Sequence, residues 1–339
     1  MDNNTLQISP TKALIIGSGG QDGSYLKELL EARGVLVEGI TRNFFDDVRY
    51  GEDLTSLDVP SFDQIQNLMK IPYFQKISRN IELSNPDVIY HLAAYHGPSG
   101  VIRNSKNDRA MMWLIHVGIT AVILETIKRV QLSSRVIVAG SSLMYMPGDV
   151  DLYVDENTKA NPVNYYAETK LQARVVLQKY KDSYGLSAQM AILFNHESPR
   201  RPAGYLASDI AAQFIKAWEL GTQVIRVRNP NSRIDVCDAR DVITALADMP
   251  LFEQSDFVIG SGSAREVRAL IMDVAKILGL GKIEVEYINH DDSILNSGRY
   301  NSIVVANSQH AKNILGWKQS HDVANTIAEM FQERLNRAD

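Results

Sequence analysis

The sequence predicts an α/β protein in which a doubly wound parallel sheet is joined to a smaller C-terminal α/β lobe. Three observations support this fold class. Short apolar runs recur along the first two thirds of the chain, as expected for strands that are buried on both faces. Stretches with helical periodicity separate these runs. The first run ends in a glycine-rich turn that opens a helix, which is typical of a nucleotide-binding unit.

The composition is that of an ordinary globular protein. The chain has 339 residues, of which 45% are hydrophobic and 22% are charged, enough for one or two domains. A net charge of -5 argues against nucleic acid or an anionic membrane as a partner. No apolar run reaches the length of a membrane-spanning helix, and Cys237 is the single cysteine, so we expect no disulfide framework and no metal site. The expected location is the cytoplasm.

The first strand and the turn after it form a predicted nucleotide cradle. Gly17, Gly20 and Gly23 follow a GxxGxxG spacing. A helix within 24–34 and a second strand over 35–40 complete a βαβ unit, which is the context that such a motif requires. Gly17 allows the tight turn, Gly20 lets backbone N–H groups reach a pyrophosphate, and Gly23 allows the helix to pack closely on the strand.

The end of the second strand indicates which nicotinamide cofactor fits. NAD-binding proteins usually place a carboxylate there to bind the ribose 2′-hydroxyl. This chain has no carboxylate until Asp46, and Arg42 at the strand end could neutralise a 2′-phosphate. The pattern therefore favours NADP over NAD, with a solvated surface arginine as the alternative for Arg42.

A third strand is expected over residues 55–59, with a helix after it. Asp58 would accept a hydrogen bond from the adenine amino group, and Val59 would lie beside it. Asp53 is the competing candidate for this contact.

The fourth and fifth strands end in side chains that suit a cofactor and a reaction. The fourth strand, within 85–97, stops at Ala93 and Ala94, whose small side chains would let a dinucleotide lie close to the backbone. The fifth strand, within 135–145, ends in a serine pair that begins with Ser141.

The helix after the fifth strand carries a candidate acid–base set. Tyr166 and Lys170 are four residues apart and share one helix face. We expect the Lys170 ammonium to lower the pKa of the Tyr166 phenol from about 10 towards neutrality. A hydroxyl from Ser141 would complete a proton relay, as needed to move a hydride on or off a carbinol carbon. Tyr165 is expected to be structural, and a plain surface pair is the alternative for Tyr166 and Lys170.

Together these motifs resemble an extended short-chain dehydrogenase/reductase, and they match the GDP-mannose 4,6-dehydratase group more closely. ILFNHESPRR, which ends in Arg201, is the most specific signature. The resemblance covers most of residues 12–245 and fades after them. The stretches that carry it are GQDGSYL (20–26), IYHLAA (89–94), KDSYGLSAQMAILFNHESPRR (181–201) and DARDV (238–242).

The resemblance implies a Rossmann fold, a nicotinamide cofactor and a nucleotide-sugar substrate, most readily a GDP-linked one. Asn195, Glu197 and Ser142 would contact this substrate. A hydrogen-bonded core imidazole is the alternative to a cofactor contact for His196. The residues expected at the cofactor are Gly17, Gly20, Gln21, Asp22, Gly23, Arg42, Asp58, Val59, Leu92, Ala93, Ala94, Lys170, His196 and Arg201.

The chain departs from this group at one catalytic position. The dehydratases carry Thr-x-Glu after the fifth strand, and the glutamate removes the proton of sugar carbon 5 before water leaves carbon 6. Here the segment is Ser141-Ser142-Leu143, and leucine has no proton-accepting atom. Loss of a positioned base typically costs about 10²–10⁴-fold in rate. Keto reduction or epimerisation is therefore favoured over dehydration, unless another group such as His96 replaces the base.

Other departures are smaller. Asn43 stands where the group has a second arginine, which weakens the NADP prediction, and the loop at 93–100 differs. The ending resembles the group's "R…D…KA…LGW" pattern with Arg299, but Asn307 replaces the aspartate.

Residues 1–185 are expected to form the NADP-binding domain, to which a segment near 224–248 returns, and residues 186–339 the discontinuous substrate lobe. Relatives pair through the equivalents of the helices near 107–130 and 165–183, so a homodimer or homotetramer is expected by analogy. The elements expected in the last third are a strand before Asp241, strands over 257–260 and 283–288, a helix around 265–279 and a C-terminal helix from His321.

Two classes of function remain open. One is an NADP-dependent sugar-nucleotide enzyme that acts at carbon 4, either a reductase or epimerase or a true dehydratase with a relocated base. The other is a non-catalytic NADP sensor that kept the fold. An intact Tyr166 and Lys170 pair argues against the sensor, which has no need of an acidified phenol.

Overall fold

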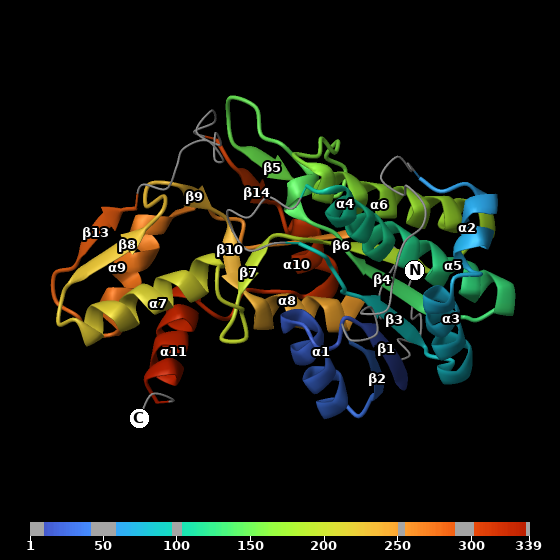
Figure 1. Ribbon diagram of the computed structural model, residues 1–339, viewed down its shortest axis with the longest axis horizontal. Helices are drawn as coiled ribbons and strands as arrows, with labels where there is room; N and C mark the ends of the chain where they lie inside the picture. The colour runs from blue at the N-terminus through green and yellow to red at the C-terminus, as the bar shows by residue number, and fades with distance from the viewer. Residues whose placement is uncertain (1–9, 42–58, 97–103, 250–254, 289–301, 337–339) are drawn as a thin grey trace.

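A six-stranded parallel sheet forms the centre of the larger domain (Figure 1), with strand order β11-β6-β4-β3-β1-β2. Every neighbouring pair in it is parallel. Apart from the edge strand β2, which is largely exposed or half-buried, the strands are almost continuous buried apolar runs, as expected for strands covered by helices on both faces. This confirms the predicted fold class. The strands are β1 (Lys12–Ile16), β2 (Leu36–Ile40), β3 (Val88–His91), β4 (Arg135–Ala139), β6 (Ala188–Leu193) and β11 (Phe257–Ile259).

The computed structural model describes residues 10–41, 59–96, 104–249, 255–288 and 302–336. The strand predicted over 55–59 falls almost wholly outside these ranges, and its last residue, a valine, lies in a bend. The predicted boundary at residue 185 remains a prediction, although β6 and β11 lie beyond it and belong to the large sheet.

Side chains of each central strand alternate between the two hydrophobic cores on either face of the sheet. On one side, Leu14 and Ile16 pack against α3, α5 and α6. On the other side, Ala13 and Ile15 pack against α1, α8 and α10. Successive side chains of a β-strand point to opposite faces of the sheet. Because both faces of this sheet are covered by helices, residues at odd and even positions of a central strand are both apolar. The helices are α1 (Gln21–Ala32), α2 (Phe62–Leu68), α3 (Pro72–Ser84), α5 (Ile119–Val130), α6 (Tyr165–Tyr184), α8 (Ala239–Asp248) and α10 (Gln309–Leu315).

The helical stretch Lys106–Val130 is long and apolar enough to cross a membrane by composition alone. The expectation that no apolar run has spanning length is therefore wrong. The fold buries 94% of its apolar window, so the stretch serves as a core helix. It consists of α4 (Lys106–Trp113), a π-helical turn over Leu114–Gly118 and then α5.

The smaller lobe, at the left of Figure 1, has its own hydrophobic core. It contains α7 (Leu206–Glu219), α9 (Val267–Ile277) and α11 (Val323–Leu335), which surround the parallel pair β8 (Val224–Val227) and β13 (Glu284–Tyr287). The predicted helices and strands of this region are present, with the last helix beginning at Val323. Short pairs join the lobe to the sheet: β7 (Asn195–Glu197) with β10 (Val236–Asp238), β5 (Leu152–Val154) with β14 (Val304–Ala306), and β9 (Arg233–Ile234) with β12 (Arg265–Glu266).

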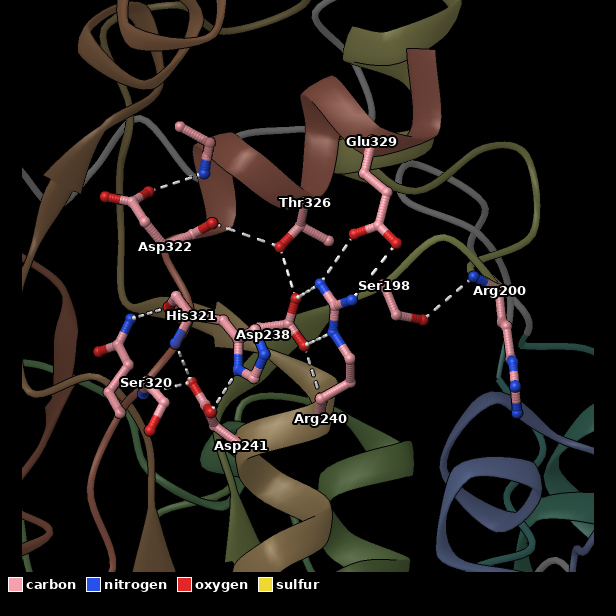
Figure 2. A network of polar contacts seen from close by, with 12 residues as sticks. Ser198, Arg200, Asp238, Arg240, Asp241, Ser320, His321, Asp322, Thr326 and Glu329 are labelled. Atoms are coloured by element: carbon pink, nitrogen blue, oxygen red, sulfur yellow. Dashed lines mark hydrogen bonds and ion pairs between the residues drawn. The ribbon is translucent and has the colours of Figure 1, made fainter. Parts of the chain in front are cut away.

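A buried carboxylate, shown in Figure 2, ties α11 to the start of α8. Asp238 caps α8 by accepting from the Arg240 backbone N–H at 2.7 Å, and it pairs with the Arg240 guanidinium at 2.8 Å. Thr326 of α11 donates to Asp238 at 2.5 Å, and Arg240 also pairs with Glu329 of α11 at 2.9 Å. Burial raises the pKa of Asp238, but hydrogen bonds from Arg240 and Thr326 outweigh it and lower that pKa.

Replacing Asp238 with alanine is expected to lower the free energy of unfolding by about 3–5 kcal/mol, because it strips a buried, paired charge from the network. Glu329→Ala is the matched control. Its side chain is 41% exposed, so its loss should cost at most about 1 kcal/mol. Urea denaturation of both variants measures the difference, and equal losses would contradict the assigned role of Asp238.

Candidate active site

A cleft of about 660 Å³ lies at the carboxyl ends of β3, β4 and β6, beside the start of α1. This is where parallel α/β sheets bind their ligands. Several residues expected from the sequence line it: Asp22, Leu92, Ala94, Ser141, Tyr166, Lys170, Asn195, His196 and Arg201.

The glycine turn brings three backbone segments into direct contact. Gly17 has a φ of +100°, and a Cβ there would lie 2.7 Å from the backbone nitrogen of Ala93. A Cβ on Gly23 would lie 2.2 Å from the carbonyl oxygen of Gly17. No side chain in the described residues caps α1, whose N-cap residue is Gly20. The first N–H groups of α1 are therefore available to an anion, which fits the pyrophosphate of a nicotinamide dinucleotide.

An ion pair connects α1 to the segment after β6. His196 Nε2 lies 3.0 Å from Asp22 Oδ1, and His196 Nδ1 donates to the Phe194 carbonyl at 2.7 Å. Burial disfavours both charges, but their mutual attraction and hydrogen bonds raise the pKa of His196 and lower that of Asp22. His196 is thus a hydrogen-bonded, partly buried imidazole that also lines the cleft. Gln21 joins this cluster by accepting from Ser198 Oγ at 2.8 Å.

The fold brings Ser141, Tyr166 and Lys170 into the same cleft. Lys170 Nζ donates to the Ala139 carbonyl at 2.8 Å and lies 5.8 Å from the centre of the Tyr166 ring. Burial raises the pKa of Tyr166, and the hydrogen bond with Ser141 offsets only part of that effect. The predicted lowering of the phenol pKa by Lys170 is therefore wrong for this structure, because burial outweighs the nearby polar groups.

Lys170 is almost fully buried, with only 2% of its surface exposed. Burial lowers its pKa to about 7, and the Asp22 charge opposes that shift. A lysine that titrates near neutrality can, in its charged form, donate a hydrogen bond to a ribose hydroxyl and stabilise negative charge on a neighbouring phenol.

The positions expected to contact substrate divide into two groups. Asn195 lines the cleft, and its amide donates to the Asp235 carbonyl at 3.3 Å. Ser142 and Glu197 are buried, and neither belongs to the cleft wall. Glu197 lies 3.4 Å from Arg201 Nε, and burial raises its pKa to about 7. Leu143 does line the cleft and is 43% exposed, so a base at that position would face the substrate.

Some expected cofactor contacts cannot be placed. Arg42 and Asp58 lie outside the described residues, as do Asp46 and Asp53. Val59 packs against the hydrophobic core beside α3 and α5 and is not part of the cleft wall. The preference for NADP over NAD, which depends on Arg42, therefore stays a prediction.

Two histidines flank Tyr166: His96, which the sequence analysis named as a candidate base without locating it, and His116, which it did not single out. The His116 ring comes from the π-helical turn and lies 5.1 Å from the Tyr166 ring, edge to face. His116 Nε2 accepts the Tyr95 backbone N–H, so Nδ1 carries the proton that is donated to Thr169 Oγ1 at 2.7 Å. The His96 ring lies 5.6 Å from the Tyr166 ring. Single histidines without a motif carry no signal that would reveal these contacts.

Further residues of the cleft wall were also missed. Tyr165, expected to be structural, lines the cleft with the Arg109 guanidinium 4.0 Å from its ring centre. Asn164 caps α6 by accepting from the Ala167 N–H. The other missed members of the wall are Asn104, Met112, Ala139, Gly140, Glu168, Leu193 and Phe194. Among the residues that the structure describes, no group of three His, Cys, Asp or Glu side chains could hold a metal ion.

A Rossmann-type sheet with a glycine turn and a Ser–Tyr–Lys set at its carboxyl edge defines a short-chain dehydrogenase/reductase. Within that class, the chain belongs to the GDP-mannose 4,6 dehydratase family, whose sequence model matches residues 14–330. The resemblance inferred from the motifs is confirmed, and the match extends into the last third, where the motifs fade.

Curated relatives agree with this assignment, and solved structures share the fold. The chain is 30% identical to GDP-mannose 4,6-dehydratase of Vibrio cholerae, over 79% of this chain and 72% of the relative. It is 28% identical to GDP-mannose 4,6 dehydratase 2 of Arabidopsis thaliana, over 98% of this chain and 89% of the relative. Its fold is similar to that of UDP-glucose 4-epimerase from Thermotoga maritima with UDP-glucose, with a TM-score of 0.73, 16% identity and coverage of 97% and 100%. Its fold is also similar to that of RMD from Pseudomonas aeruginosa complexed with NADPH, with a TM-score of 0.69 and 18% identity. This match covers 95% of this chain and 98% of the RMD chain.

Lys170→Met is expected to stabilise the protein most at low pH. The Lys170 pKa falls from 10.5 to about 7 on folding, so between these values the unfolded chain binds a proton that the native protein has lost. The contribution of Lys170 to the free energy of unfolding therefore becomes less unfavourable as pH rises across that window, by up to about 1.4 kcal/mol per pH unit.

Unfolding of both proteins between about pH 6 and pH 10 tests this prediction. The advantage of Lys170→Met should be largest near pH 6 and should shrink as pH rises. Lys179, exposed on the same helix, provides the control Lys179→Met. An advantage that stays constant with pH would show that Lys170 does not titrate in this window.

Proposed function

We propose that the protein is an NADP-dependent enzyme that acts at carbon 4 of a nucleotide-linked hexose, most readily a GDP-linked one. The observation that carries this proposal is the meeting of Ser141, Tyr166 and Lys170 in one cleft beside the open start of α1. Membership of the GDP-mannose 4,6 dehydratase family supports an enzymatic role on sugar nucleotides. Solved structures of similar fold contain NADPH, as in RMD, or NAD, as in dTDP-glucose 4,6-dehydratase from Bacillus anthracis, which supports a nicotinamide cofactor. The choice of NADP depends on Arg42.

The chain's own groups divide the binding task. The N–H groups at the start of α1 would hold the pyrophosphate, and the close contact between Gly17 and the Ala93 backbone keeps that helix start beside the end of β3. The Lys170 ammonium would hold a ribose hydroxyl. When bound, the nicotinamide accepts or supplies the hydride.

Tyr166 would exchange the proton on the carbon-4 oxygen. Because burial raises its pKa, the phenol carries its proton at neutral pH and is suited to protonate a forming alkoxide. Ser141, which hydrogen-bonds to it, would hold the same substrate oxygen. This protonation state favours keto reduction, with epimerisation as the other reaction that needs no elimination.

A second candidate is dehydration. Leu143 presents no base to the cleft, which argues against it. The histidine at position 96 lies beside Tyr166 and is the specific observation that keeps dehydration as a candidate.

The substrate and reaction can be tested together. A thermal-shift screen of GDP, UDP, CDP and dTDP sugars, with NADP and with NAD, would identify ligands that raise the melting temperature by mass action. Incubation with GDP-mannose and NADP then reports the reaction by mass. We expect no loss of water, and a 4-keto-6-deoxy product would favour dehydration instead. If no sugar nucleotide is turned over although NADP binds, the proposal fails and a sensor role is supported.

Tyr166→Phe is expected to lower turnover by about 10²–10⁴-fold, because it removes the proton that the carbon-4 oxygen needs. NADP affinity should stay unchanged in a fluorescence titration, since the ring remains. Tyr165→Phe, which removes the neighbouring hydroxyl, is the matched control and should retain most activity. Wild-type turnover by Tyr166→Phe would exclude the phenol as the acid.

We also propose a cytoplasmic homodimer or homotetramer. The side chains of Ile119–Ile127 in α5 are buried within one chain, so α6 would supply the exposed part of a pairing surface, including Val175. Light scattering of the purified protein measures this mass, and a monomer would contradict the proposal.

A further inference from the structure

His96 of the large domain and Tyr205 of the small lobe form a polar pair beside the cleft. His96 follows β3 in the large domain, and Tyr205 is the N-cap residue of α7 in the small lobe. The Tyr205 hydroxyl lies 3.2 Å from His96 Nδ1, and the two rings meet edge to face with centres 5.4 Å apart. The Arg201 guanidinium packs on the Tyr205 ring at 3.9 Å. The pair is therefore held from both lobes.

This pair lies next to the proposed acid. The His96 ring contacts the Tyr166 ring edge to face, with centres 5.6 Å apart, and His96 is an exposed member of the cleft wall. A group so placed can reach a carbon adjacent to the one whose oxygen Tyr166 serves. The Tyr205 hydroxyl can pair with either neutral tautomer of His96; in the tautomer that donates Nδ1–H to the Tyr205 oxygen, Nε2 carries a lone pair that can accept a proton.

The carboxylates of the cleft are less suited to this role. Glu168 lines the cleft but is two residues from Tyr166 on α6, about 200° around the helix axis, so it projects from a different face. Glu197 is buried beside Arg201 and is not part of the cleft wall. Asp22 is already paired with His196.

We propose that His96, oriented by Tyr205, is the catalytic group that exchanges a proton with carbon 5 of the substrate once carbon 4 is a ketone. This inference rests on the proposed carbon-4 chemistry and adds a residue to it. His96 Nε2 takes the carbon-5 proton, and the electron pair of that C–H bond forms the C4–C5 double bond of an enolate. Tyr166 donates a hydrogen bond to the enolate oxygen.

The enolate then resolves in one balanced step. A proton returned to carbon 5 regenerates the ketone, with the same or the inverted configuration, and the substituent on carbon 6 stays in place. His96 would thus supply the carbon-5 proton transfer for which Leu143 has no group.

Deuterium exchange tests this step without requiring a hydride to move. The probe is GDP-4-keto-6-deoxymannose, a ready-made 4-ketone, incubated in D₂O with the protein and NADP. We expect deuterium at carbon 5, detected by NMR and mass, well above the rate without protein. His96→Asn should slow this exchange by about 10²-fold or more, because it removes the proton-accepting nitrogen.

Further variants and measurements distinguish loss of the proton-accepting group from loss of folding or cofactor binding. Glu168→Gln tests the competing carboxylate of the cleft wall, and the inference requires that it slow exchange less than His96→Asn does. Tyr205→Phe should be intermediate because the imidazole loses its orienting partner. Melting curves and NADP titrations of His96→Asn should match wild type, since the side chain is exposed. Wild-type exchange by His96→Asn, or no exchange by wild type, would overturn the inference.

A separate measurement distinguishes failure of the proposed carbon-4 reduction from failure of the role inferred for His96. Consumption of NADPH with the same ketone reports reduction at carbon 4 independently of exchange. If reduction occurs without carbon-5 exchange, the proposed function stands and the role of His96 is excluded. If exchange occurs without reduction or turnover of any sugar nucleotide, His96 acts as inferred and the proposed reductase is wrong.

Discussion

The contact between the first glycine turn and the end of β3 is the constraint on which the active-site region depends. Gly17, Gly23 and Ala93 meet at distances that no side chain could share, since a Cβ on either glycine would lie within 2.7 Å of backbone atoms. This contact sets the start of α1 against the carboxyl edge of the sheet. Asp22 in the first turn of α1 and the side chains that follow β3 and β4 therefore line one cleft.

Within that cleft, burial controls the protonation states. Lys170 is held in a medium that lowers its pKa to about 7, while Tyr166 is held protonated in the same surroundings. Both shifts follow from the cost of a charge in a dry site. The buried lysine is a destabilising element at neutral pH, and the partly buried His196–Asp22 ion pair lies in the same cleft wall. Stability and chemistry thus oppose each other at this site, as is common in enzymes.

The two lobes contribute different kinds of group. The large domain supplies the glycine turn, Ser141 and the α6 pair, whereas Tyr205 comes from the small lobe and Asn195 from the strand pair that joins the two. The network around Asp238 fixes α11 of that lobe to α8 of the domain. Because Tyr205 contacts His96, any movement of the lobe also moves a group beside the proposed acid. The position of the lobe and the placement of His96 are therefore physically linked.

The sequence by itself determined the sheet, the glycine cradle and the set formed by Ser141, Tyr166 and Lys170. The spacing of apolar residues, of the glycines and of residues along one helix is a local property that can be read from short segments. The loss of a base at Leu143 is also visible in one segment. Only the tertiary structure decided the other features. His196 meets Asp22 across 174 positions of chain, and Tyr205 meets His96 across 109. The sign of the Tyr166 pKa shift depends on burial, which arises only when distant segments pack together and exclude water.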